Sequence, residues 1–149
     1  RKNSLGLLWN DAETQRDALL GDQIHLGQTW DGPALALKSL GEPVHYQAPV
    51  EGAMAWVDGL AMLNSAVNVD AVYAFLDFAY DPENAGLATQ SHGYNSTVLG
   101  ADRFAGESYA RNFAEAYPGE SLSRLNPWPS EAPWYAALRT EFVARFQDG

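Results

Sequence analysis

The sequence contains no cysteine. This absence excludes disulfide bridges, thiolate metal sites and cysteine nucleophiles, although it does not identify a cellular compartment. The chain also has no apolar run that approaches the ~18 residues of a membrane-spanning helix. It shows no internal repeat and no low-complexity segment. Any fold of this chain is therefore held together without disulfide bridges.

Basic residues are scarce. Nine lysines and arginines stand against nineteen aspartates and glutamates, which gives a formal net charge of −10. This charge argues against nucleic acid or an anionic membrane surface as the main partner. It is compatible with a cationic ligand, but acidity also keeps ordinary proteins soluble, so charge alone does not decide.

The chain has 149 residues, 46% of them hydrophobic, which is enough for one ordinary domain with a core. It opens at Arg1 without an initiator methionine. We therefore expect a processed chain or a fragment.

Apolar periodicity and turn residues predict helices that alternate with short strands. The clearest helix is 70–80, where apolar residues recur at i, i+3, i+4 and i+7, and Asp81-Pro82-Glu83 ends it. The alternation favours an α/β fold. Other predicted elements are helices at 12–20, 33–41, 82–90, 107–117 and from Pro133 onward, strands at 24–30, 43–47 and 55–62, and loops at 93–97 and 118–133.

The most informative pair of residues is Trp56 and Asp58. They lie two positions apart in a predicted strand, where side chains alternate between two faces, so we expect both to point the same way. An aromatic ring attracts an organic cation, and a carboxylate accepts its N–H bonds. The pair therefore predicts a binding site for an organic cation.

Several motifs, in this order and spacing, carry a resemblance to a known family. They are Leu20–Gly27 leading into Thr29-Trp30, Pro49–Asp58, Asn68–Tyr80 followed by Asp81-Pro82-Glu83, and His92-Gly93-Tyr94. With them the chain resembles the C-terminal half of bacterial extracellular solute-binding proteins of the spermidine/putrescine (polyamine) class, which serve ABC importers. The resemblance covers roughly residues 5 to 149.

The resemblance implies a periplasmic-binding-protein-like fold of type II, in which two α/β lobes clamp the ligand. By this reading 1–52 belongs to the second lobe, 53–103 is a hinge crossover with a first-lobe segment, and 104–149 completes the second lobe. The segment 53–103 would then lack most of the sheet on which it packs. Exposed apolar faces of this kind favour self-association.

The resemblance also implies roles for four residues. Asp58 would bind a ligand ammonium group, and Trp30, Trp56 and Tyr94 would enclose its methylene chain. Read without the resemblance, Asp58 caps a turn before Gly59, and a tryptophan packs in the core.

Asp31 leaves two interpretations open: a second carboxylate for the ligand, or a cap for the helix that begins at Pro33. The chain departs from the family at Trp128. In spermidine-preferring relatives a ligand-contacting glutamine follows the aligned tryptophan, whereas here Pro129 follows, and proline has no side-chain donor or acceptor. Glu131 either compensates for this loss or is a solvated loop residue.

The resemblance implies a binding protein and not an enzyme. It would capture a putrescine- or spermidine-like polyamine in the periplasm, or outside the cell at a membrane, and deliver it to ABC permease subunits. The alternatives are the same architecture with an amino acid derivative, an opine or a sugar as ligand, and a purely structural interaction module.

Catalysis finds little support in the residues. Glu51 and Asp58 need not face each other as an acid–base pair, and Ser96 lies in no Gly-x-Ser-x-Gly motif. The three histidines lie far apart and flank no carboxylate at a ligand-like spacing, so we expect no metal, no cofactor and no catalytic residue.

Overall fold

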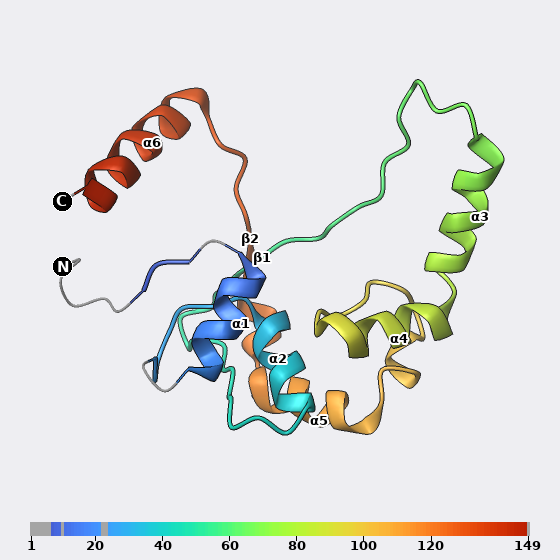
Figure 1. Cartoon of the computed structure of the whole chain (residues 1–149), viewed down its shortest axis with the longest axis horizontal. Coiled ribbons are helices and arrows are strands. Elements are labelled where there is room, and N and C mark those ends of the chain that lie inside the picture. Colours follow the sequence, from blue (N-terminus) through green and yellow to red (C-terminus); the bar gives the residue numbers. More distant parts are fainter. Residues whose placement is uncertain (1–6, 10, 22–23, 149) are drawn as a thin grey trace.

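The computed structural model describes residues 7–9, 11–21 and 24–148. Figure 1 shows a helical body from which two long segments extend, one through residues 56–68 to α3 and one through residues 128–132 to α6. The body contains the helices α1 (Ala12–Leu20), α2 (Asp31–Ser39), α4 (Pro82–His92) and α5 (Glu107–Ala116), with short 3-10 turns at 101–103 and 121–124. The two outlying helices are α3 (Val69–Ala79) and α6 (Pro133–Asp148).

The helices begin and end close to where their capping residues predict. Asp11 accepts the Thr14 N–H at 2.7 Å at the start of α1, and Gly21 follows its last turn. Asp81 accepts the N–H groups of Glu83 and Asn84 at the start of α4. These bonds satisfy backbone donors that a helix N-terminus leaves unpaired, which explains why the predicted starts of α1 and α4 are confirmed. The helix predicted at 33–41 lies two residues earlier, and α4 runs two residues longer than predicted.

The sheet consists of two short parallel strands, β1 (Ala53–Ala55) and β2 (Leu125–Pro127). Ala53 pairs with Leu125 and Ala55 with Pro127, and the last backbone bond runs from the Trp128 N–H to the Ala55 oxygen at 3.0 Å. The predicted strand 55–62 is therefore wrong, and β2 lies inside a segment predicted as a loop. Prolines at 127 and 129 donate no backbone hydrogen bond, so β2 offers little to pair beyond Ala55.

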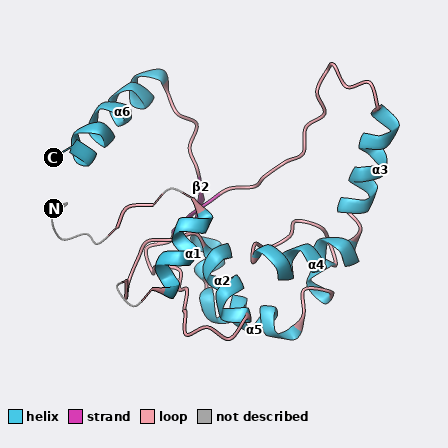
Figure 2. Cartoon of the chain, viewed as in Figure 1, coloured by secondary structure: helices cyan, strands magenta, loops and turns pink. Residues whose placement is uncertain are grey.

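The predicted strands 24–30 and 43–47 are also wrong for the residues that the structure describes (Figure 2). In the first segment the Trp30 N–H donates to the Gln15 side chain at 3.1 Å. After the second, the Ala48 N–H donates to the Ala116 oxygen of α5 at 2.9 Å. These two bonds attach the chain to α1 and α5 instead of to a neighbouring strand.

The core surrounds α2, which packs against α1, α4 and α5. Leu35 and Leu37 are fully enclosed on this helix. Leu35 belongs to one buried cluster with Tyr109 and Ala116 of α5, and Leu37 to a second cluster with Val44. The helix that follows Trp30 is thus the buried centre of the body.

The two outlying helices leave their apolar side chains exposed. No residue of α3 is buried, and Phe75 and Phe78 are 57% and 62% exposed. On α6, Leu138, Phe142 and Phe146 are exposed as well. None of the described helices is long and apolar enough to cross a membrane. The whole is a mixed helical structure with a small parallel sheet, compatible with part of an α/β protein.

Candidate ligand-binding site

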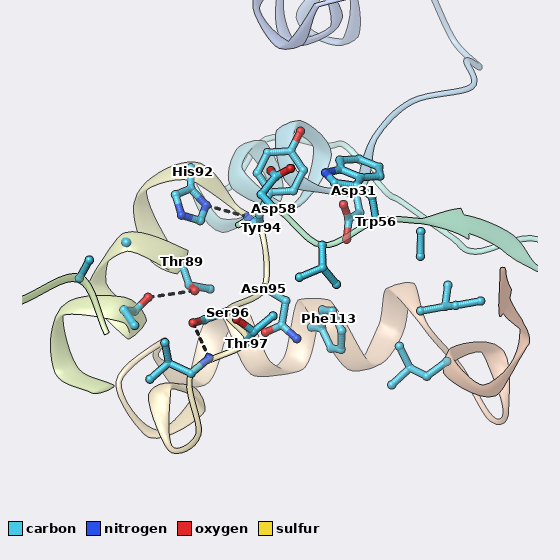
Figure 3. A pocket seen from close by; sticks show the side chains of 18 of the residues that line it. Asp31, Trp56, Asp58, Thr89, His92, Tyr94, Asn95, Ser96, Thr97 and Phe113 are labelled. Carbon is cyan, nitrogen blue, oxygen red and sulfur yellow. Dashed lines mark hydrogen bonds between the residues drawn. The ribbon is translucent and has the colours of Figure 1, made fainter. Parts of the chain in front are cut away.

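An open pocket of about 670 Å³ lies where the chain leaves β1 and passes α4 and α5. Figure 3 shows Asp58 and Tyr94 beside each other along one side, with Trp56 and Asp31 next to them. The opposite side in this view carries Asn95, Ser96, Thr97 and Phe113. The pocket thus combines aromatic rings, carboxylates and neutral polar groups from segments far apart in the sequence.

Three aromatic rings form a continuous row at this pocket. The ring centroids of Trp30 and Trp56 are 6.2 Å apart at an interplanar angle of 68°, and those of Trp56 and Tyr94 are 6.2 Å apart at 64°. Edge-to-face contacts at such distances are a preferred aromatic geometry. Trp56 and Tyr94 line the pocket, whereas Trp30 supports Trp56 from outside the lining.

Tyr94 is held by a close approach of two helices. Gly93 ends α4 with φ of +81°, and a Cβ at this position would collide with the Gly32 oxygen of α2. Gly32 in turn lies under the Tyr94 ring. The nearest ring carbons of Tyr94 are 2.6 Å from the point that a Cβ at Gly32 would occupy. The buried Tyr109 hydroxyl donates to the Gly93 oxygen at 3.1 Å. Glycine is required at 93 because only it combines this φ with this contact.

Trp30 is held by a buried glutamine. Gln15 of α1 is 2% exposed, and its side-chain oxygen accepts the Trp30 N–H at 3.1 Å and the Thr29 hydroxyl at 2.5 Å. A buried amide oxygen that accepts two bonds fixes both partners, because leaving it unpaired is costly. Gln15 therefore anchors the segment that carries the first ring of the row.

The two carboxylates of the pocket differ in their surroundings. Asp58 is exposed, and it follows Trp56 on the segment that leaves β1. Asp31 is partly buried as the first residue of α2. It accepts the Gly32 N–H at 2.9 Å through Oδ1 and the Tyr117 hydroxyl at 2.8 Å through Oδ2. Asp31 is thus the first residue of α2 and not its cap, which is Trp30, so the capping interpretation is wrong. It lines the pocket, and its role as a ligand carboxylate stays a prediction.

The charges around the pocket are negative. Burial, and then the charges of Asp31 and Asp58, raise the pKa of Tyr94, so this phenol stays protonated at neutral pH. Burial, together with the charge and hydrogen bond of Asp31, also raises the pKa of Tyr117. Partial burial lowers the pKa of His92, and its Nδ1 accepts the Tyr94 N–H at 3.0 Å; both favour the neutral ring. Among the described lining residues, only Asp31 and Asp58 carry a formal charge.

The four residues predicted as ligand contacts thus lie together: Trp56, Asp58 and Tyr94 line one pocket, and Trp30 touches Trp56. The expected reason is wrong, because Trp56 and Asp58 lie beyond the strand and their common direction does not come from strand alternation. Their ligand roles stay predictions.

Other residues lie apart from this pocket or were missed. Glu131 forms an ion pair with Arg139 at 3.0 Å, and neither it nor Trp128 lines the pocket. No group of three potential metal ligands occurs among the residues that the structure describes. Sequence reasoning missed Phe113 of α5, Tyr117 directly after it, and the polar run Asn95-Ser96-Thr97. That run directly follows Tyr94, which was the available signal.

Comparison with known proteins finds relatives among the bacterial periplasmic binding proteins. The chain is similar to the spermidine/putrescine-binding periplasmic proteins of Escherichia coli and Salmonella typhimurium, each 24% identical over 127 residues. It is also similar to spermidine/putrescine-binding periplasmic protein 1 of Haemophilus influenzae, 21% identical over 121 residues.

These matches cover 85% and 81% of this chain, but only 36% and 33% of the relatives' lengths. No family model matches the chain, and no solved structure matches it. The resemblance seen in the motifs is confirmed: the chain is similar to spermidine/putrescine-binding periplasmic proteins over 85% of its length, and it spans 36% of the length of the first two relatives.

Proposed function

We propose that this chain is the ligand-binding part of an ABC-importer substrate-binding protein that captures a putrescine- or spermidine-like polyamine. The observation that carries the proposal is one pocket in which the Asp58 carboxylate lies with the rings of Trp56 and Tyr94. The names of the relatives point to the same ligand class. Those relatives are binding proteins, which favours binding over catalysis.

In this proposal different residues contact different parts of the ligand. Asp58 accepts N–H bonds from an ammonium group, which are charge-assisted and therefore stronger than neutral bonds. Trp56 and Tyr94 lie along the methylene chain and attract the adjacent cation through their faces, at ~0.5–2 kcal/mol per contact. Trp30 keeps Trp56 in place. A polyamine satisfies both features of the pocket, because it alternates apolar stretches with cations.

The wider mechanism rests on the resemblance. Segments 1–52 and 104–149 would belong to one lobe, and 53–103 would cross to the other. Ligand contacts that span both lobes would shift the population toward a closed form. The permease subunits of a periplasmic importer would then recognise that form. The pocket faces open space in this chain, as a half-site of such a clamp would.

A tryptophan-fluorescence titration tests the proposal. Putrescine and spermidine should each give a saturable change, because Trp56 lines the pocket, and a neutral sugar should give none. Asp58→Asn should weaken polyamine binding about tenfold, less than the roughly hundredfold expected for a fully desolvated pair, because Asp58 is exposed.

Asp70→Asn provides the matched control, since it removes the same charge on the exposed surface of α3, outside the pocket. It should leave the affinity unchanged. Equal losses in both variants would show that only net charge matters, and would overturn the assignment of Asp58. Saturable binding of the sugar that is insensitive to salt would replace the polyamine with a neutral ligand.

A further inference from the structure

The charge of the pocket exceeds what a single ammonium group can neutralise. Two carboxylates line it, Asp31 and Asp58, and no lysine or arginine lies among the described lining residues. The Nδ1 of His92 accepts the Tyr94 N–H at 3.0 Å, which favours the neutral ring. A ligand with one cation bound at Asp58 would leave Asp31 uncompensated in the same pocket. Unpaired charge that a ligand helps to bury opposes binding.

Asp31 retains the capacity to bind a cation. An ionised carboxylate offers about four lone-pair sites. The structure accounts for two of them, with the Gly32 N–H at 2.9 Å and the Tyr117 hydroxyl at 2.8 Å. These bonds also hold the side chain in one orientation, so less entropy is lost when a ligand binds.

The position of Asp31 suits a second cation site. It is the residue after Trp30, and Figure 3 places it next to Trp56, whereas Asp58 lies at the Tyr94 ring. Both carboxylates are close enough to Tyr94 to act on its phenol electrostatically. The two carboxylates thus lie at different places beside the rings in Figure 3, and both act on the Tyr94 phenol.

We propose that Asp31 is a second cation-binding carboxylate, through which the pocket selects ligands with two ammonium groups over ligands with one. This inference rests on the proposed function and adds a residue that sets specificity. It differs from a purely structural role, in which Asp31 only accepts the Tyr117 hydroxyl and the first turn of α2. The two roles respond differently to the ligand's charge.

The test compares putrescine with butylamine, which has the same carbon chain and only one ammonium group, on the 149-residue chain. The wild-type chain should bind putrescine more tightly. Asp31→Asn should reduce that preference by about tenfold, mainly through weaker putrescine binding. Asp102→Asn removes the same charge from an exposed residue outside the pocket, so it should retain the preference.

A second variant covers the case in which Asp31→Asn fails to fold. Asp31→Glu keeps the charge and extends the carboxylate by one methylene group. It should shift the optimum among straight-chain diamines toward a shorter chain than the wild type prefers. An unchanged optimum would argue against contact between Asp31 and the second ammonium group.

The outcomes separate the two proposals. If Asp31→Asn keeps the putrescine-to-butylamine ratio, or if Asp102→Asn lowers it equally, the preference does not come from Asp31 and this inference is overturned while the proposed function stands. If the wild-type chain binds neither amine, both proposals are overturned for this chain.

Discussion

At the residue scale, the site depends on a few side chains that position others. Gln15 fixes the backbone of Trp30, and Gly32 and Gly93 allow Tyr94 to lie over the start of α2. None of these three residues needs to touch a ligand. Their substitution should therefore act first on stability and on the placement of the rings.

Gly93→Ala should destabilise the chain by at least ~2 kcal/mol, because a Cβ there meets the Gly32 oxygen and the backbone keeps a positive φ. Gly41→Ala is the matched control. Gly41 has φ of +89°, and no atom lies within 4 Å of the point that a Cβ would occupy, so this variant should cost only ~1 kcal/mol. Urea denaturation measures both. Equal losses would mean that the close approach at Gly93 contributes nothing.

The pKa of Tyr94 should depend on the charges of the two carboxylates even when no ligand is bound. Its pKa is raised by burial and by the charges of Asp31 and Asp58, so Asp31→Asn and Asp58→Asn should each lower it toward the ordinary value. A raised tyrosine pKa stabilises the fold below the unfolded value of about 10, and this contribution is lost as pH rises through the folded pKa. NMR of ring-labelled tyrosine measures the titration. A Tyr94 pKa unmoved by either variant would place the carboxylates too far away.

At the element scale, local signals predicted the helices well. Asp11, Gly21, Asp81 and Pro82 act through neighbours within one turn, and such interactions can be inferred from the sequence. The strands could not be predicted in the same way, because a strand exists only where another segment pairs with it. β1 pairs with residues about seventy positions later, and Pro127 limits the length of that ladder.

The candidate site shows the same division. Trp30, Trp56, Asp58 and Tyr94 were predicted because motif and resemblance mark them individually. Phe113 and Tyr117 were missed because their place at the pocket depends on how α5 packs against α2, which no local pattern indicates. The bond from Tyr117 to Asp31 joins residues 86 positions apart.

The cap of α4 offers a test at this scale. Asp81→Ala should cost ~1 kcal/mol, because it removes the acceptor for two backbone N–H groups. Asp77→Ala, which changes an exposed carboxylate inside α3, is the control and should change the stability little. Thermal unfolding followed by circular dichroism compares the two. A loss at Asp81 no greater than at Asp77 would show that the cap bonds do not stabilise the helix.

At the scale of the whole molecule, apolar surface remains without cover. The α6 face formed by Tyr135, Leu138, Phe142, Val143 and Phe146 lines an exposed apolar hollow, and the stripe of α3 is exposed as well. Exposed contiguous apolar area of this kind is unusual for a monomer and favours association. The chain corresponds to only part of its relatives' length, and those faces would need a partner.

We therefore expect the isolated chain to associate with itself at micromolar concentration through these faces. Phe142→Glu should weaken the association, because it places a charge in the centre of the α6 face. Leu99→Glu is the control, since Leu99 is 95% exposed and lies on neither helix, and it should leave the association unchanged. Sedimentation equilibrium measures the mass of each variant. A wild-type chain that stays monomeric across the concentration range would show that the exposed faces do not drive self-association. Equal weakening by both variants would show that the contact does not involve the α6 face.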